Sequence, residues 1–283
     1  MWMKAMKYLL SGLIFLTGLL LSEARAEEQI DDITTGEFHF TLALGYGGIE
    51  NPRAKSDDIT TYVLPSWSYY DDRFYVENFT LGYSLYESDS LLVDLQTRLN
   101  EDGFFFELDG WNKVFLSDIL GYKPNKQPLF GPEIPEVPIE RHISYLGGLS
   151  TTWLTPYSDF TLGYFHDISG VHQGNEIHFK AKKNMAFSWG ALGFEVGAIR
   201  KSSQLISYYY HFTQAELGRG RTLQPQSAAI NYHTSGVVNV PLWQDINFVA
   251  IVTYTWLGDE ITKNLMVEKD GYLSGFIGVS YAF

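Results

Sequence analysis

Apolar side chains recur at every second position through much of this 283-residue chain, which is the spacing of a β-strand. The segment 246–256 places six of them on one face: Ile246, Phe248, Ala250, Val252, Tyr254 and Trp256. Segments 37–46, 91–99, 192–198 and 273–283 alternate in the same way. An α-helix would instead space its apolar residues three and four apart. The alternation therefore predicts an all-β protein.

Less regular alternation extends the prediction to about twelve strands, within a range of ten to fourteen. The further candidate strands are 59–70, 73–86, 103–109, 142–154, 158–167, 174–183, 186–199, 203–212 and 226–238. Five of the ten prolines fall between these candidates, at Pro124, Pro128, Pro132, Pro135 and Pro138. Because proline cannot donate to a sheet ladder, we expect a long loop near 110–140.

Residues 1–26 have the form of a secretory signal peptide. Lys4 and Lys7 precede an uncharged run at 8–21, and Ala24-Arg25-Ala26 supplies a small-x-small cleavage site. The run is shorter than the roughly 20 residues that a membrane-spanning helix needs, which disfavours the alternative of an uncleaved anchor. We expect cleavage after Ala26, export from the cytoplasm, and a mature β-domain of residues 27–283.

Composition excludes several classes of protein. A net charge of −13 argues against a nucleic-acid partner, because such a binder needs a basic face. The absence of cysteine excludes disulfides, thiolate metal sites, cysteine nucleophiles and an N-terminal lipid-modified cysteine. A mean hydropathy of −0.10 is too low for a helical protein with several membrane spans.

A dozen alternating strands in an exported protein could form a soluble sandwich or barrel, or a membrane barrel. The membrane barrel is favoured because the faces opposite the apolar ones are polar or glycine-rich, as a hydrated lumen requires. Aromatic residues also cluster near strand ends, as membrane-interface girdles require: Trp67, Tyr69, Tyr70, Tyr83, Tyr86, Tyr208, Tyr209, Tyr210, Tyr254 and Trp256. We therefore predict a transmembrane antiparallel up-and-down β-barrel in the cell outer membrane, surrounded by outer-membrane lipid and lipopolysaccharide.

The chain ends inside an alternating strand, with Tyr281 and Phe283 on its apolar face. A soluble sheet would be left with an unprotected edge there, whereas a closed barrel pairs its last strand with its first. A terminal aromatic residue resembles the signal that the outer-membrane barrel assembly machinery selects, so this machinery is an expected partner.

Charged residues on the non-apolar faces are candidates for a polar lumen. Lys180 and Lys182 share a face, and a lysine facing lipid at mid-bilayer would cost roughly 2–4 kcal/mol. These lysines should face the lumen, with Glu37 or Glu195 as partners, or lie in solvent beyond the hydrocarbon. The full set of candidate lumen residues is Glu37, His39, Asp94, Arg98, Lys180, Lys182 and Glu195.

No catalytic, metal-binding or cofactor-binding set is expected. His166, Asp167 and Ser169 carry the residue types of a hydrolase site, but His166 and Asp167 are adjacent in a strand and point to opposite faces. Asp167, Ser169 and Gly170 are better suited to a turn in which the aspartate accepts backbone N–H groups and the glycine takes a positive φ. The histidines show no compact spacing for a metal.

Several short motifs resemble the MipA/OmpV family of outer-membrane proteins. They are 254–261, 275–283 and 167–174, where the family has an Asp-x-Ser-Gly segment (here Asp167, Ser169 and Gly170) before a further glycine, here Gly174. Residues 208–210, with Glu216 downstream, resemble the tyrosine-rich late strand of the family. Where the family usually reads Ser-Pro-Leu-Val, this chain has Lys263-Asn264-Leu265-Met266-Val267, which marks a divergent member.

The resemblance implies a barrel of ten to twelve strands. For the best-known branch it also implies a non-enzymatic scaffold between a lytic murein transglycosylase and a peptidoglycan synthase, and hence a periplasmic murein hydrolase or synthase as partner. The residues alone leave two alternatives: a narrow porin-like channel for small solutes and, less favoured, an outer-membrane hydrolase.

Overall fold

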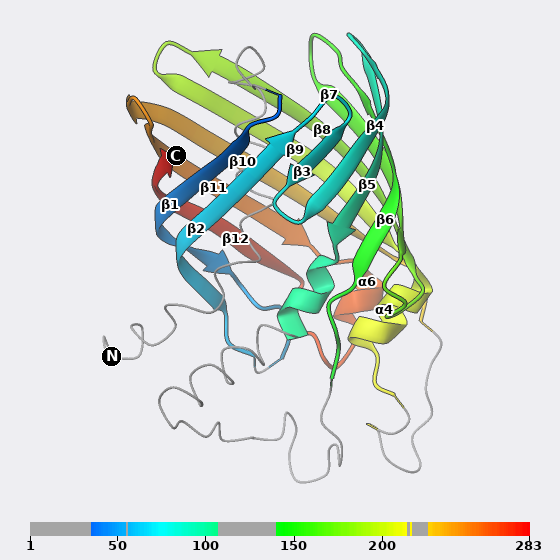
Figure 1. Cartoon of the computed structure of the whole chain (residues 1–283). Coiled ribbons are helices and arrows are strands. Elements are labelled where there is room, and N and C mark those ends of the chain that lie inside the picture. The colour runs from blue at the N-terminus through cyan, green and yellow to red at the C-terminus, as the bar shows by residue number, and fades with distance from the viewer. Residues whose placement is uncertain (1–34, 55, 107–139, 214–215, 217–225) are drawn as a thin grey trace, which may run out of the picture.

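The computed structural model describes residues 35–54, 56–106, 140–213, 216 and 226–283, which form a closed barrel of twelve antiparallel strands (Figure 1). Each strand pairs with its neighbours in sequence, and β12 closes the barrel on β1. The strands are β1 (Phe38–Ile49), β2 (Ile59–Tyr70), β3 (Phe74–Glu77), β4 (Thr80–Ser88), β5 (Leu91–Leu99), β6 (Tyr145–Trp153), β7 (Asp159–Asp167), β8 (Asn175–Phe187), β9 (Gly190–Lys201), β10 (Ala229–Trp243), β11 (Ile246–Trp256) and β12 (Gly271–Ala282). This confirms the predicted fold class and strand number.

The first and last strands pair with each other in the barrel wall. The β1–β12 register runs from Thr41 opposite Ala282 to Ile49 opposite Ser274. Beyond the last pair, the backbone N–H of Phe283 donates to the carbonyl of Phe40 at 2.9 Å. The terminal strand therefore has no open edge.

The two faces of the wall differ as the alternation predicts. On β11, Val252 and Trp256 point outward and are 52% and 47% exposed, whereas Val249 and Ile251 point inward and are 3% and 4% exposed. Exposed aromatic side chains lie near both ends of the outer surface, where interfacial girdles occur in membrane barrels. They include Trp153, Trp243 and Phe283 near one end, and Tyr46, Tyr232 and Trp256 near the other.

The two ends of the barrel are built differently (Figure 1). The end that holds the start of β1 and the end of β12, here the terminal end, has short turns at 71–73, 89–90, 154–158, 188–189 and 244–245. The opposite end, here the loop end, carries long connections at 50–58, 100–144, 168–174, 202–228 and 257–270. The 3-10 turn η1 (Glu101–Gly103), the helical turn at 104–106, α4 (Ser203–Tyr210) and α6 (Asp259–Thr262) all belong to these connections. We refer to these four elements as the cap.

Two predicted strands are wrong, because the structure makes them helical. The segment 203–212 contains α4, whose N-cap Ser202 accepts a hydrogen bond from the backbone N–H of Leu205. The buried residues of α4 are Leu205, Ile206, Tyr209 and Tyr210, one helical face rather than one strand face. The tyrosines at 208–210 therefore belong to the cap and not to a late strand or a girdle.

The predicted strand 103–109 is also wrong for its described part. Asn100 accepts from the backbone N–H groups of Asp102 and Gly103 and so starts η1, which leads into the helical turn at 104–106. Residues 107–109 and almost all of the proline-rich stretch near 110–140 lie outside the described residues, as does the predicted signal peptide, 1–26.

The predicted strand 73–86 is in fact two short strands. Asn78 adopts a positive φ of 52° and turns the chain between β3 and β4. Because β3 is short, β2 pairs with it only at Ser68, Tyr69 and Tyr70. Pro65 lies in β2 before the stretch that pairs with β3. On that side of Pro65, β2 has no described strand beside it and is locally an edge. Proline suits an edge position because it has no N–H to donate to a neighbouring strand.

Among the described residues, no helix combines the length and the apolar character that a membrane span would need.

Candidate functional site

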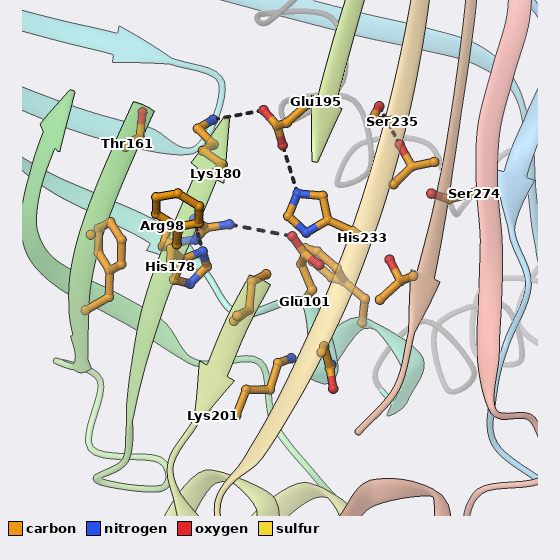
Figure 2. A pocket seen from close by; sticks show the side chains of 18 of the residues that line it. Arg98, Glu101, Thr161, His178, Lys180, Glu195, Lys201, His233, Ser235 and Ser274 are labelled. Atoms are coloured by element: carbon orange, nitrogen blue, oxygen red, sulfur yellow. Dashed lines mark hydrogen bonds and ion pairs between the residues drawn. The ribbon is translucent and has the colours of Figure 1, made fainter. Parts of the chain in front are cut away.

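A cavity of about 200 Å³ lies inside the barrel, on the lumen side of the cap (Figure 2). Glu101, Phe104 and Phe105 line it from the connection that follows β5. The rest of its lining comes mainly from lumen-facing side chains of β5 to β12. We call this cavity the chamber, and it is the candidate functional site.

One wall of the chamber contains an arginine, a histidine and a glutamate in series. Arg98 Nη1 lies 3.2 Å from His178 Nδ1, and His178 Nε2 lies 2.7 Å from Glu176 Oε2. Because arginine has no acceptor, Nδ1 must accept from Arg98, and the ring proton on Nε2 then donates to Glu176. The guanidinium also lies 5.5 Å from the centroid of the Phe165 ring.

A second charged group spans three neighbouring strands. Figure 2 shows Glu195 of β9 between Lys180 of β8 and His233 of β10. Its carboxylate lies 3.4 Å from Lys180 Nζ and 2.9 Å from His233 Nε2. Gly197 leaves room for this imidazole, since a Cβ there would lie 2.3 Å from His233 Cε1.

The wall next to His233, which continues from β10 to β12 and lies across the barrel from Arg98 of β5, is neutral and polar. Thr253 Oγ1 donates to Ser235 Oγ at 2.8 Å. The other neutral polar residues lining this side of the chamber are Asn231, Thr255 and Ser274. The chamber thus combines ionic groups on one side with hydroxyl and amide groups on the other.

Buried charges attach the cap to the barrel wall. Lys201, the last residue of β9, lies 2.6 Å from Asp102 of η1 and 3.8 Å from Glu176 of β8. Asn100 donates to the same Glu176 at 2.8 Å, and Tyr210 of α4 donates to Asp102. Since a buried charge is costly unless it is paired, these contacts hold η1 and α4 against the wall.

Apolar packing completes the cap. Phe105, Phe106, Met266 and Tyr272 join the buried face of α4 and Ile261 of α6 in one cluster. Arg53 donates to the carbonyl of Phe105 at 2.7 Å, and its guanidinium lies 3.9 Å from the Phe106 ring centroid. The loop end therefore has a hydrophobic core of its own.

Ser144, His172 and Asp167 lie together at the loop end and have the residue types of a hydrolase triad. His172 Nε2 lies 2.9 Å from Ser144 Oγ, but His172 Nδ1 accepts from the backbone N–H of Gly174 at 2.9 Å. The ring proton is therefore on Nε2 and donates to the serine, so the imidazole cannot act as its base. Asp167 Oδ2 is 3.9 Å from Nδ1, and Ser144 is 0% exposed.

Asp167 instead organises the β7–β8 turn. Its carboxylate accepts from the backbone N–H groups of Ser169, Gly170, His172 and Gln173 at 2.6–3.1 Å. Gly170 has a φ of +76°. His172 is packed behind this turn, and burial lowers its pKa below the ordinary value, although Asp167 and Glu176 act to raise it.

The structure brings together some of the lumen candidates. Arg98, Lys180 and Glu195 all line the chamber. Asp94 shares a strand face with Arg98, and Lys182 shares one with Lys180, but neither lines the chamber.

Two other candidates lie near the terminal end. His39 is on the inward-facing set of β1, and its Nε2 is buried with no hydrogen-bond partner among the described residues. Glu37 lies just before β1 and is exposed. The terminal residues Tyr281 and Phe283 pack their rings against each other on the outer surface, with centroids 4.7 Å apart.

Sequence reasoning missed several members of the site. His178 and Glu176 alternate with outward-facing Ile177 and Phe179, and Lys201 lies on the inward face of β9 that holds Glu195. All three could have been found by extending the alternation of inward and outward residues along β8 and β9. Asp102 and Ser144 lie in connections, where alternation gives no signal. The described residues contain no cluster of His, Asp and Glu side chains that could hold a metal ion.

A protein-family model described as "MltA-interacting protein MipA" matches residues 43–283. Two curated relatives, both "Putative outer membrane protein YiaT", come from Escherichia coli strain K12 and Escherichia coli O157:H7. Each is 20% identical over 254 residues, which cover 86% of this chain and 91% of the relative.

Two solved structures are similar at the level of the barrel. The CymD monoaromatic hydrocarbon channel matches with a TM-score of 0.38 and 12% identity, over 88% of each chain. The Ralstonia pickettii toluene transporter TbuX matches with a TM-score of 0.33 and 10% identity, over 88% of this chain and 90% of the transporter.

Proposed function

We propose, since the chain belongs to the MltA-interacting protein (MipA) family, that this outer-membrane β-barrel is a scaffold for a murein-remodelling enzyme. The family description names MltA as the interacting protein, and the resemblance of the sequence to the family implies that this partner is a lytic murein transglycosylase. The barrel would hold that enzyme at the inner face of the outer membrane, close to its peptidoglycan substrate.

The observation that carries this proposal is the closed loop end. Five side chains at the centre of the cap are 0% exposed: Leu205, Ile206, Tyr209, Tyr210 and Ile261. A diffusion channel needs a continuous wet path, and a barrel of this size has little free lumen once side chains fill it. A capped barrel is better suited to presenting a surface than to passing solutes.

The face that would dock the enzyme is set by the topology. In outer-membrane barrels the short turns face the periplasm and the long loops face outward, so the terminal end of this barrel is periplasmic. Its turns at 71–73, 89–90 and 244–245 contain Asp71, Asp72, Asp89 and Asp245. These turns are the surface that a periplasmic enzyme would reach first.

Site-specific photo-cross-linking in intact cell envelopes tests the proposal. A photoreactive residue at Asp72, Asp89 or Asp245 should capture a murein transglycosylase, identified by mass spectrometry. The matched control places the same residue at Leu265, which is 64% exposed at the loop end, and should capture none. Absence of the enzyme from all three turn positions, or its capture from Leu265, would contradict a periplasmic scaffold.

A narrow channel for small solutes is the second candidate function, and the polar chamber favours it. Conduction would require the cap to move aside, because its apolar cluster covers the chamber at the loop end. Ion conductance separates the two functions, since a barrel that stays capped gives no discrete openings. A hydrolase has the least support, because the tautomer of His172 and the burial of Ser144 oppose catalysis.

A further inference from the structure

We infer that the chamber is a binding site for a small organic carboxylate, and that Arg98 is the residue that holds it. This site goes beyond the scaffold role and does not depend on it, because the chamber lies inside the barrel rather than on its periplasmic turns. The ligand class follows from the state of Arg98, the neutralisation of the other charges, and the size of the chamber.

Arg98 has more hydrogen-bond donors than partners. Its guanidinium carries five N–H groups, of which His178 accepts one at 3.2 Å. Its nearest carboxylate belongs to Glu101, 3.5 Å from Nη2. Its Nε is buried and has no hydrogen-bond partner among the described residues. A buried donor without an acceptor is costly, so the arginine is prepared to take a further anionic acceptor.

The other cations at the chamber are already closely paired. Lys201 is held by Asp102 at 2.6 Å, and the Lys180 ammonium shares Glu195 with His233. The Arg98–Glu101 contact, at 3.5 Å, is longer than the shortest ion contact of either lysine, and its side chains are 20% and 34% exposed. Glu101 can therefore be displaced by a ligand, whereas the partners of Lys201 are buried and held in place.

The ligand should be planar and negatively charged at one end. A carboxylate matches the flat fork of guanidinium donors, which can bind both of its oxygens at once. His178 and the Phe165 ring both contact the guanidinium, and Figure 2 shows Arg98 beside His178 and facing Glu101. The arginine is thus positioned before any ligand arrives.

The rest of the chamber limits the size and polarity of the ligand. Its volume of about 200 Å³ is below the range of roughly 300–1,000 Å³ that is usual for drug-sized ligands. Ser235, Thr253 and Ser274 on the facing wall offer hydroxyl groups to a second polar group. A short hydroxy acid meets these conditions, and a long-chain fatty acid does not.

Calorimetric titration of the folded, full-length mature barrel in detergent micelles tests the inference. The probes are lactate, propane-1,2-diol, which lacks the carboxylate, and inorganic phosphate. Lactate should bind saturably, and the diol should not bind. Arg98→Gln should weaken lactate binding by about tenfold or more, the usual effect of losing a hydrogen bond to a charged group.

Two further variants separate a ligand role for Arg98 from a structural one. Glu101→Gln removes the competing carboxylate and should tighten lactate binding several-fold, an effect that a merely structural arginine would not produce. Lys183→Gln is the matched control, since this lysine contacts the carbonyl of Pro156 near the terminal end and does not line the chamber. It should leave binding unchanged.

Three results would overturn the inference: no saturable lactate binding by the wild-type barrel, equal binding of the diol, or tighter binding of phosphate than of lactate. If Arg98→Gln fails to show the heat-modifiable gel migration of a folded barrel, the Glu101→Gln titration decides alone. Unchanged or weaker lactate binding in that variant would then refute the role of Arg98. Failure of the cross-linking experiment would leave these titrations unaffected.

Discussion

Arg141 and Glu216 form a two-pronged ion pair at the loop end, with Nη1–Oε1 at 2.7 Å and Nη2–Oε2 at 2.9 Å. The two side chains are only 4% and 5% exposed. Arg141 also donates to the carbonyl groups of Tyr208 and His211, at the end of α4. The pair therefore ties the strand-entry segment before β6 to the segment that follows α4.

Removing one member of this pair should loosen the cap. Arg141→Met leaves Glu216 as a buried carboxylate without its cation, a change that typically costs about 3–5 kcal/mol. Hydrogen exchange of the α4 amide groups measures the free energy of opening, which should fall by that amount. Lys263→Met is the control, since the Lys263–Glu260 pair is solvent-exposed and worth less than about 1 kcal/mol. Equal effects of the two variants would contradict a role for the buried pair in holding the cap.

The cap should also lose stability in mild acid. Burial lowers the pKa of His172 from its ordinary value of 6.5, so the open state binds a proton more readily than the closed state. The neutral imidazole contributes its full stability above the ordinary pKa, and this contribution decreases as the pH falls below it. His211 acts in the same direction, because burial and the neighbouring Arg141 lower its pKa too.

Hydrogen exchange of α4 between pH 7 and pH 5 checks this prediction, after correction for the intrinsic pH dependence of exchange. The free energy of opening should fall across the range, and His172→Gln should flatten the slope. The Arg141–Glu216 pair should not contribute there. Burial alone would raise the pKa of Glu216, but hydrogen bonds from Arg141 and Thr213 outweigh burial, and the pKa is lowered. The carboxylate therefore stays ionised between pH 7 and pH 5, and the ion pair is lost only below that range. A slope that is zero, or unaltered in His172→Gln, would rule out the histidine as the sensitive group.

The fold could be predicted because one physical rule governs most of it. Strands that separate lipid from lumen must alternate, and in β12 this alternation separates outward Leu273 from inward Ser274. The rule fails where apolar residues are consecutive. At 208–210 three tyrosines in a row fit either a strand or a helix, and only contacts with distant residues such as Phe106 and Tyr272 decide for the helix.

The candidate site was only partly predictable for a related reason. The alternation of inward and outward side chains places Arg98, Lys180 and Glu195 in the lumen, because these residues lie within regular strands. The cap depends on pairs that are remote in sequence, such as Lys201 with Asp102, which are 99 positions apart. No local pattern encodes such a pair, since it forms only after the barrel has closed.

A lysine should destabilise the barrel to very different extents at two neighbouring positions of β11. Val252→Lys would place an ammonium on the outward face and should destabilise the barrel by roughly 2–4 kcal/mol. Thr253→Lys, one residue later, places the same group in the hydrated lumen and should cost far less. Urea titration of the barrel refolded in lipid vesicles compares the two variants. A cost for Thr253→Lys as large as that for Val252→Lys would contradict the assignment of the two faces.

Ser144 should be inert as a nucleophile. Its hydroxyl is buried, and it receives the Nε2 proton of His172 instead of giving up its own. A fluorophosphonate probe should therefore not label the folded barrel, while labelling a serine hydrolase added to the same sample. Labelling that disappears in Ser144→Ala would show that the cluster is a working triad and would revive the hydrolase alternative.

Single-channel recording in planar bilayers tests the claim that the loop end is closed. The wild-type barrel should insert and give no discrete openings, because the buried cap cluster around Tyr209 and Ile261 lies across the loop end of the described barrel. Regular openings of one conductance level from the wild-type protein would contradict the claim, and would favour the channel over the scaffold.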